Sequence, residues 1–237
     1  MNKTFSAQML KTYMECPYKY YLEYEKKIKI PQDVSFADTG KNLHALINYY
    51  FKGFDVSKLE KALSDDEKTL WANFLNAKID RNNIFKSEYG FNVKIKDDNW
   101  LTGRIDAITK EDNTYTIYDW KTGKLPENPE KDIQTIVYLF ALDKILQKRN
   151  FSGEKPILRF VYMDLKTSET KAVFIQNETL NPSIETIYAI IKESQEFSET
   201  NYCSKNNNLQ NSCSNGIKNT SCKTCKFNSI CKTDVFL

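Results

Sequence analysis

The sequence predicts a mixed α/β fold, and two observations carry this prediction. Hydrophobic residues recur at helical spacing over about the first 82 residues, and the period then changes to the alternation typical of strands. Farther along, strand-like and helical segments follow each other. A chain of 237 residues, with 41% hydrophobic and 13% aromatic residues, can bury a sizeable core in one or two domains. This composition excludes a disordered or fibrous chain.

The first part of the chain predicts four helices. The first begins after Ser6, a favourable N-cap, and ends at Cys16. Because proline suits the first position of a helix, Pro17 can start the second, which is rich in tyrosine. The third helix ends at Gly53, and the fourth fills about residues 57 to 82.

The rest of the chain predicts strands and helices in mixed order. Three strands separated by short polar turns form an antiparallel meander. Two more strands and two helices follow. The predicted strands are 89–96, 100–108, 115–121, 157–165 and 172–176, and the predicted helices are about 130–149 and 181–199.

Charge is distributed unevenly along the chain. The total of 34 Lys and Arg against 31 Asp and Glu gives a net charge of +3, too small a surplus to argue for nucleic-acid binding by itself. Residues 1–30 carry six Lys and three Glu, and residues 201–237 carry five Lys and one Asp. Both ends are therefore basic, and the middle is acidic.

We expect a soluble, cytoplasmic protein. The N-terminal segment lacks the apolar core of a signal peptide, and no apolar run approaches the roughly 18 to 20 residues of a membrane span. In a reducing cytosol, the six cysteines indicate metal binding rather than a disulfide framework.

Two neighbouring predicted strands each place an acidic residue in an apolar run. These residues are Asp106 and Asp119, and alternation puts Lys121 on the same face as Asp119. A buried carboxylate is costly without a compensating cation, and paired carboxylates suit Mg²⁺. A lysine beside such an ion can act on an attacking water and offset charge on a phosphate, as phosphodiester hydrolysis requires. The simpler interpretation is a solvated strand end with an ion pair.

A compact cysteine set lies near the C-terminus. Cys222, Cys225 and Cys231 follow a Cys-x2-Cys-x5-Cys pattern, which can place three thiolates around one centre. The candidates for a fourth ligand are Cys16, Cys203 and Cys213. The last two lie in an asparagine-rich stretch that predicts a loop, where two free thiols are the preferred interpretation. From the spacing alone, zinc and an iron–sulfur cluster are equally suitable.

Taken together, these features resemble the PD-(D/E)xK nuclease superfamily, in particular its RecB-type branch with the CRISPR-associated exonucleases. The resemblance rests on Ser6 to Tyr24 with Cys16-Pro17, Gly40 to His44, Gly103 to Asp106, Asp119 to Lys121, and Gln134 to Tyr138. It implies a restriction-endonuclease-like core over residues 36–200, with a mixed central sheet flanked by helices. It also implies a helical cap bound to an iron–sulfur cluster, formed from residues 1–35 and 201–237.

The resemblance also implies roles for the candidate site residues. Asp106 and Asp119 become metal ligands together with the Trp120 carbonyl, and Lys121 acts on the attacking water. His44 becomes a further ligand, which shifts the preference from Mg²⁺ toward Mn²⁺ because imidazole is softer than carboxylate. Without the resemblance, His44 would be a polar side chain at a helix edge.

Four more polar residues have two interpretations each. Gln134 and Tyr138 stand four apart on a predicted helix, where they either support the active site and the DNA backbone or form a half-polar flank. Glu88 is either an outer carboxylate of the metal site or, more simply, a solvated acid. Arg104 either meets a phosphate or pairs with Asp106.

By the same resemblance, a 4Fe-4S cluster is bound by Cys16, Cys222, Cys225 and Cys231. Such a cluster would join the two basic ends of the chain into one DNA-binding surface. Its lysines would be Lys19, Lys26, Lys223 and Lys226, and its stacking rings Tyr18, Tyr20 or Phe227. A solvated basic face over a tyrosine core is the other interpretation.

The implied function is a metal-dependent deoxyribonuclease, acting as an exonuclease on single-stranded DNA or DNA ends. Its setting would be DNA repair, recombination or CRISPR spacer acquisition, with helicase or adaptation proteins as partners. The alternatives are a non-catalytic, metal-stapled DNA-binding module and a subunit of a larger helicase–nuclease complex. The sequence contains no phosphate-binding loop of a built-in helicase.

Overall fold

The structure is a computed structural model that describes residues 3–30, 35–148, 154–174, 177–197 and 224–233. The chain divides into two compact units. The first comprises Met1–Ala7 and Asp33–Glu185, and the second comprises Gln8–Gln32 and Thr186–Leu237. Each unit is described by itself below.

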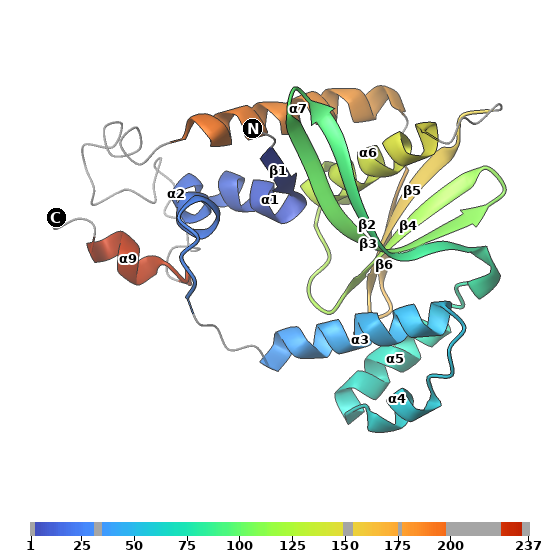
Figure 1. The fold of residues 1–237 in the computed structure, drawn as a ribbon. Coiled ribbons are helices and arrows are strands. Elements are labelled where there is room, and N and C mark those ends of the chain that lie inside the picture. The colour runs from blue at the N-terminus through green and yellow to red at the C-terminus, as the bar shows by residue number, and fades with distance from the viewer. Residues whose placement is uncertain (1–2, 31–34, 149–153, 175–176, 198–223, 234–237) are drawn as a thin grey trace. The chain divides into compact units, whose positions relative to one another are not determined.

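The first unit is built on a mixed, six-stranded sheet (Figure 1). Its strands are β1 (Lys3–Ser6), β2 (Ile84–Lys96), β3 (Asn99–Glu111), β4 (Thr114–Lys121), β5 (Ile157–Asp164) and β6 (Thr170–Phe174). The order is β1-β3-β4-β5-β6, and β2 pairs with the other edge of β3. The pairs β1/β3 and β4/β5 are parallel, whereas the other pairs are antiparallel. The predicted antiparallel meander is confirmed as β2, β3 and β4.

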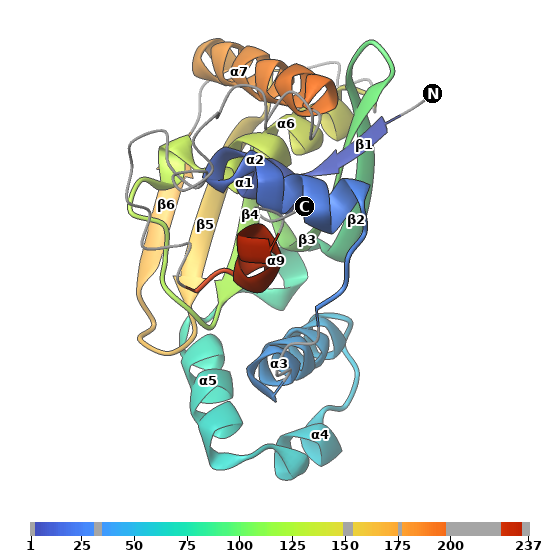
Figure 2. The same ribbon diagram turned by 90° about the vertical axis from the view of Figure 1, so that its left-hand side faces the viewer.

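Helices cover both faces of this sheet. The helical segments of the first unit are α3 (Ser35–Phe51), α4 (Ser57–Ala62), α5 (Asp65–Asn76), η2 (Arg81–Asn83), η3 (Pro129–Lys131), α6 (Ile133–Gln147) and the first part of α7 (Asn177–Glu196). Helix α6 packs against β2, β3 and β5. Helices α3 and α5, which lie side by side in Figure 2, form a core with the opposite face, including Ala107 of β3 and Trp120 of β4. Because neighbouring strand residues alternate between faces, Asp106 and Asp119 point away from this core.

The predicted single helix over residues 57–82 is wrong, because the chain forms two helices there. Leu63 is extended between α4 and α5, and Ser64 starts α5 as its N-cap. The Ser64 side chain accepts a hydrogen bond from the Glu67 backbone, and the Glu67 carboxylate accepts one from the Ser64 backbone. This capping box satisfies two backbone donors and makes a new helix start more favourable than a continuous helix.

The sheet is also larger than the sequence predicts. Strand β1 is not predicted, because its four residues pair with β3 almost a hundred positions away, from Lys3 opposite Asn99 to Ser6 opposite Thr102. Strand β2 begins at Ile84, ahead of the predicted start. The earlier start brings Glu88 into the sheet.

The second unit contains short helical segments from both ends of the chain. They are α1 (Ala7–Glu15), α2 (Pro17–Tyr20), the π-helical η1 (Tyr21–Glu25), the later part of α7 (Asn177–Glu196) and α9 (Asn228–Thr233). The predicted break at Cys16 is confirmed, since its backbone is extended and Pro17 begins α2. Tyr18, Leu22 and Phe227 form a small buried cluster in this unit.

Within the described ranges, no helix combines the length and the apolar character needed to span a bilayer.

Substitution of Gly103 should destabilise the first unit. A Cβ at this position would lie 2.6 Å from Cζ of Phe91 and 3.0 Å from Cε1 of Tyr138. These two rings pack edge to face with centroids 5.2 Å apart, so they cannot both move aside freely. We expect Gly103→Ala to lower the free energy of unfolding by about 1 to 3 kcal/mol in urea titrations. Gly90→Ala is the control, because no atom lies within 4 Å of its Cβ position. Equal stabilities of the two variants would contradict this packing.

Candidate active site

The two strand carboxylates meet on one face of the sheet. Strands β3 and β4 pair with Ala107 opposite Tyr118, so Asp106 and Asp119 are the next residues along each strand. Asp106 Oδ2 accepts a hydrogen bond of 2.9 Å from the Trp120 backbone N–H. The structure thus brings together the two acids that the sequence singles out. It also fixes Asp106 through a backbone donor in β4, the strand that carries Asp119.

Asp119 belongs to a polar group with Lys121 and Gln134. Its Oδ2 lies 2.7 Å from Lys121 Nζ, and its Oδ1 accepts a short hydrogen bond from Gln134 Nε2. Lys121 Nζ also donates to Gln134 Oε1 at 3.1 Å. Gln134 is positioned near the start of α6, where its backbone N–H donates to the capping Asp132. Lys121 and Asp119 share a face as predicted, and Gln134 links them.

Tyr138 lies one helical turn after Gln134, on the same side of α6. Burial raises the pKa of its hydroxyl, and the negative charges of Asp119 and Asp106 raise it further. Hydrogen bonds with the Arg104 backbone and the Gln134 side chain act in the opposite direction. Tyr138 is therefore a neutral hydroxyl beside the carboxylates, and it lies with Gln134 as the sequence predicts.

The electrostatics of the site favour a bound cation. Burial raises the pKa of Asp119 to about 6, the charge of Asp106 adds to this rise, and Lys121 opposes it. Asp119 Oδ2 has no hydrogen-bond donor of suitable geometry among the described residues, despite its ion pair with Lys121. Two buried carboxylates with one adjacent ammonium leave negative charge uncompensated, and a buried oxygen without a donor is costly.

His44 of α3 approaches the same carboxylates. Its Nδ1 lies 3.3 Å from Asp106 Oδ1 and 3.9 Å from Glu88 Oε1. Burial lowers the pKa of the imidazole, but the hydrogen bond and charge of Asp106, with the charge of Glu88, raise it by more. The ring therefore faces two acids, and its role as a metal ligand stays a prediction.

Glu88 is a member of the site, and the simpler interpretation of a solvated acid is wrong. Ser87 pairs with Ala107 and Tyr89 with Ile105, so Glu88 lies opposite Asp106 and on the same face of the sheet. Its side chain is only 17% exposed. Its φ of 46° is uncommon for a residue with a Cβ, and such strained positions cluster at functional sites.

Arg104 pairs with Glu88 rather than with Asp106. Its Nε lies 2.8 Å from Glu88 Oε2, while its own side chain is 66% exposed. Burial raises the pKa of Glu88, and the charge of Arg104 lowers it. Arg104 therefore holds one oxygen of Glu88 and leaves the other free to face His44.

The donor set fits a divalent metal ion. One ligand atom each from His44, Glu88 and Asp106 lies within 4.8 Å of the others. Two carboxylates and one imidazole suit Mn²⁺ and also accommodate Mg²⁺. Asp119 is not one of these three residues, but the charges of both Asp106 and His44 affect its pKa. Trp120 contributes its backbone N–H to Asp106, and a ligand role for its carbonyl stays a prediction.

Two of the predicted cluster cysteines lie in described parts of the second unit. Cys16 and Cys225, from opposite ends of the chain, both pack against the cluster of Tyr18, Leu22 and Phe227. Cys16 Sγ accepts a hydrogen bond of 3.4 Å from the Lys19 backbone as the N-cap of α2. Cys231 belongs to α9, but its side chain is outside the described atoms, and Cys222, Cys203 and Cys213 are outside the described residues.

The stacking rings predicted for a DNA-binding surface of this unit are wrong, whereas phosphate contacts by its lysines stay a prediction. Tyr18, Tyr20 and Phe227 are at most 9% exposed, so their rings pack in the interior and cannot stack on bases. Lys226 Nζ lies 2.7 Å from Glu23, and Lys19 Nζ lies 3.1 Å from Glu15. The alternative of a tyrosine core is confirmed. Lys223 is outside the described residues.

A mixed sheet with helices on both faces, and a metal-binding group of acids beside a lysine, define a nuclease-like α/β protein. The family model of the PD-(D/E)XK nuclease superfamily matches residues 4–83 and 74–232. The chain therefore belongs to this superfamily of nucleases, whose members use divalent metals.

A comparison with solved structures gave matches at low sequence identity. A crystal structure titled "Putative exonuclease" from Eubacterium rectale is 11% identical, with a TM-score of 0.50 and 82% of each chain covered. The crystal structure of SSO0001 is 16% identical, with a TM-score of 0.45, covering 97% of this chain and 86% of that one. At these identities, the first likeness supports the fold alone. A comparison with curated proteins gave no match.

Removal of Glu88 or His44 should weaken metal binding. Mn²⁺ bound only by the folded protein raises the melting temperature, because binding free energy adds to stability. We expect Glu88→Ala and His44→Ala to bind Mn²⁺ about 10-fold or more weakly in calorimetric titrations and to lose most of the thermal shift. Glu127→Ala, which removes an exposed acid of the same unit, is the matched control. Wild-type Mn²⁺ affinity in both site variants would contradict this donor set.

Proposed function

We propose that the protein is a metal-dependent deoxyribonuclease of the cytoplasm that acts as an exonuclease on single-stranded DNA or DNA ends. The observation that carries this proposal is the meeting of Asp106, Asp119 and Lys121 on one sheet face, next to His44 and Glu88. Membership of a nuclease superfamily supports the reaction class.

The acids and the histidine have the role of holding the metal. His44, Glu88 and Asp106 supply three donor atoms, and Asp119 supplies a buried carboxylate whose Oδ2 is paired with Lys121. When bound, a divalent ion supplies Lewis acidity and offsets the charge that builds up on the scissile phosphate. The backbone N–H of Trp120 and the side chain of Arg104 fix the orientation of Asp106 and Glu88.

Lys121 has the role of orienting the attacking water and stabilising negative charge. Its ammonium is held between Asp119 and Gln134, and its side chain is 30% exposed, so solvent and substrate can reach it. Gln134 donates to the acid and accepts from the amine, which fixes both groups at once. A preorganised donor of this kind contributes to catalysis because it pays no reorganisation cost during the reaction. Tyr138 supports Gln134 and lies near the same carboxylates.

We propose a 4Fe-4S cluster held by Cys16, Cys222, Cys225 and Cys231 in a cap that corresponds to the second unit, with β1 belonging to the sheet of the core. The packing of Cys16 and Cys225 on one small hydrophobic cluster supports a shared centre. A thiolate centre suits zinc as well, and the preference for iron comes from the family resemblance.

The resemblance also gives the biological setting that we propose. This setting is DNA repair, recombination or the acquisition of CRISPR spacers, with a helicase or an adaptation complex as protein partner. The competing function is a non-catalytic DNA-binding module, whose acids would serve structure alone. That module would bind DNA in Mn²⁺ without any cleavage.

Lys121 provides the most direct test of catalysis. We expect Lys121→Ala to slow the Mn²⁺-dependent degradation of labelled single-stranded DNA by about 100-fold or more, because it removes the group beside the reacting water. Asp119→Ala should have at least as large an effect. The exposed Lys124, three residues farther on, provides the control Lys124→Ala, which should keep wild-type rates. Circular dichroism checks the fold of each variant.

If either site variant cleaves at the wild-type rate in excess Mn²⁺, the assignment is wrong. If the wild type binds DNA and never cleaves it, the non-catalytic module is the better account.

The cysteine assignment predicts a coloured protein. Protein purified without oxygen should contain iron and sulfide in equal amounts, and Cys16→Ala and Cys225→Ala should lose both and melt at lower temperature. Cys203→Ala and Cys213→Ala are the controls and should keep the metal. Colourless protein containing zinc would contradict the cluster and leave the proposal for the carboxylates intact.

A further inference from the structure

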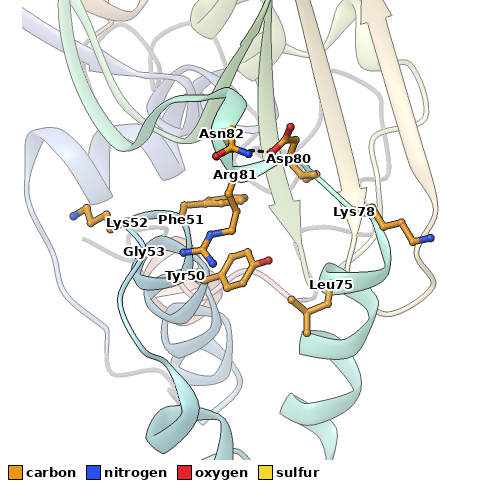
Figure 3. A pocket seen from close by; sticks show the side chains of 10 residues that line it. Tyr50, Phe51, Lys52, Gly53, Leu75, Lys78, Asp80, Arg81 and Asn82 are labelled. Atoms are coloured by element: carbon orange, nitrogen blue, oxygen red, sulfur yellow. Dashed lines mark hydrogen bonds between the residues drawn. The ribbon is translucent and has the colours of Figure 1, made fainter.

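A surface depression lies in the first unit, where α3 ends and η2 precedes β2. It has a volume of about 650 Å³. Figure 3 shows residues that line it, which come from the end of α3 and the two residues after it, the end of α5, and the segment before β2. None of the metal-site residues lines this depression, so it is a separate feature of the unit.

An arginine on an aromatic platform forms the centre of the depression. The Arg81 guanidinium lies over the Tyr50 ring, 4.3 Å from its centroid. Trp71 and Phe74 hold the Tyr50 ring edge to face, with centroids at 5.5 and 5.9 Å. Gly53, with a φ of 81°, turns the chain beside the guanidinium without a side chain. The cation is thus positioned by rings rather than by a carboxylate.

The lining carries uncompensated positive charge. Its charged residues are Lys52, Lys78, Arg81 and a single acid, Asp80. The Asp80 carboxylate accepts a hydrogen bond of 2.8 Å from the Asn82 backbone, which fixes it at the start of η2. In the described part of the chain, none of the ion pairs involves the three cations. In Figure 3, Lys52 and Lys78 extend to opposite sides, with Arg81 between them.

Exposed aromatic rings accompany these cations. Tyr49 is 46% exposed and Phe54 is 58% exposed, and their rings contact each other edge to face at 5.8 Å. Tyr49 and Phe54 flank the lining residues Tyr50 to Gly53 in the sequence. Cations that can follow a phosphate backbone, next to exposed rings that can stack on bases, are typical of surfaces that bind single-stranded nucleic acid.

The depression is close enough to the metal site to serve the same strand. His44 lies in α3, and Lys52 directly follows its last residue, Phe51, so the two are eight residues apart, which corresponds to about 12 Å along a helix axis. A strand of a few nucleotides can therefore contact both features.

We propose that this depression is a binding subsite for single-stranded DNA that passes through the metal site. Arg81, Lys52 and Lys78 contact successive phosphates, and Tyr49 and Phe54 stack on bases. The subsite gives the enzyme its preference for a single strand, since bases in a duplex are not available for stacking. This inference rests on the proposed nuclease function and names how that function selects its substrate.

Binding is measured without cleavage, with a fluorescein-labelled oligo-dT of 20 nucleotides in EDTA and fluorescence anisotropy as the signal. We expect Arg81→Gln to weaken binding about 10-fold and to reduce the slope of log K against log salt by about 0.7, since one phosphate contact is lost. Phe54→Ala should weaken binding about 5-fold to 100-fold with little change of that slope. The matched controls on α4 are Lys61→Gln and Leu59→Ala, an exposed cation and an exposed apolar residue. They should bind within about twofold of the wild type.

Cleavage assays with two substrates distinguish DNA binding at the subsite from the chemical step at the metal site. Bis(p-nitrophenyl) phosphate is too small to reach from the metal site to the depression. Arg81→Gln should therefore hydrolyse this ester in Mn²⁺ at the wild-type rate, while its KM for oligo-dT rises. Lys121→Ala should lose both activities. A wild type without either activity would refute the nuclease, and the anisotropy experiment would still test the subsite.

Three results would overturn the proposal. The first is wild-type affinity for oligo-dT in both Arg81→Gln and Phe54→Ala. The second is an equal loss of affinity for duplex DNA, and the third is tighter binding of oligo-rU than of oligo-dT. If Arg81→Gln fails to fold, Lys52→Gln gives the same test, because its exposed side chain takes no part in the ring packing.

Discussion

Two carboxylates of like charge on the buried face of one sheet impose the constraint on which the site depends. Asp106 and Asp119 raise the free energy of the folded chain unless a cation accompanies them, and Asp119 is only 5% exposed. Lys121 compensates part of the charge, and Gln134 holds the amine and the acid in register. On the other side of Asp106, the His44 imidazole offsets part of the remaining negative charge, whereas the third carboxylate, Glu88, adds to it and increases the need for a cation.

The scaffold positions this group from both faces of the sheet. Helix α6 places Gln134 and Tyr138 over β3 and β4, and its capping residue Asp132 fixes the first turn. Helix α3 brings His44 to the same carboxylates, and Asn48, one turn later, accepts a hydrogen bond of 2.7 Å from the Ser87 hydroxyl in β2. Rigid elements rather than loops therefore hold the proposed catalytic groups, which limits their freedom and favours a preorganised site.

Local sequence patterns predicted much of the core. They did not predict the features that depend on pairing between strands far apart in the sequence. Period-two alternation suffices to place Asp119 and Lys121 on one face, and the short turns suffice for the meander. The position of Glu88 opposite Asp106 depends on a shift in the pairing of β2 with β3 between Lys94 and Lys96. Without this shift, Tyr89 would lie opposite Asp106. Strand β1 depends on a parallel partner far along the chain, which no local pattern reveals. The tyrosines near the N-terminus illustrate a further limit, because composition alone does not distinguish a stacking surface from a buried cluster.

The most direct measurement is anomalous diffraction at the manganese absorption edge from crystals grown with Mn²⁺. The account predicts a manganese peak among His44, Glu88 and Asp106, on the side of the sheet where Lys121 meets Asp119. Manganese bound elsewhere, with no peak at these side chains, would contradict it.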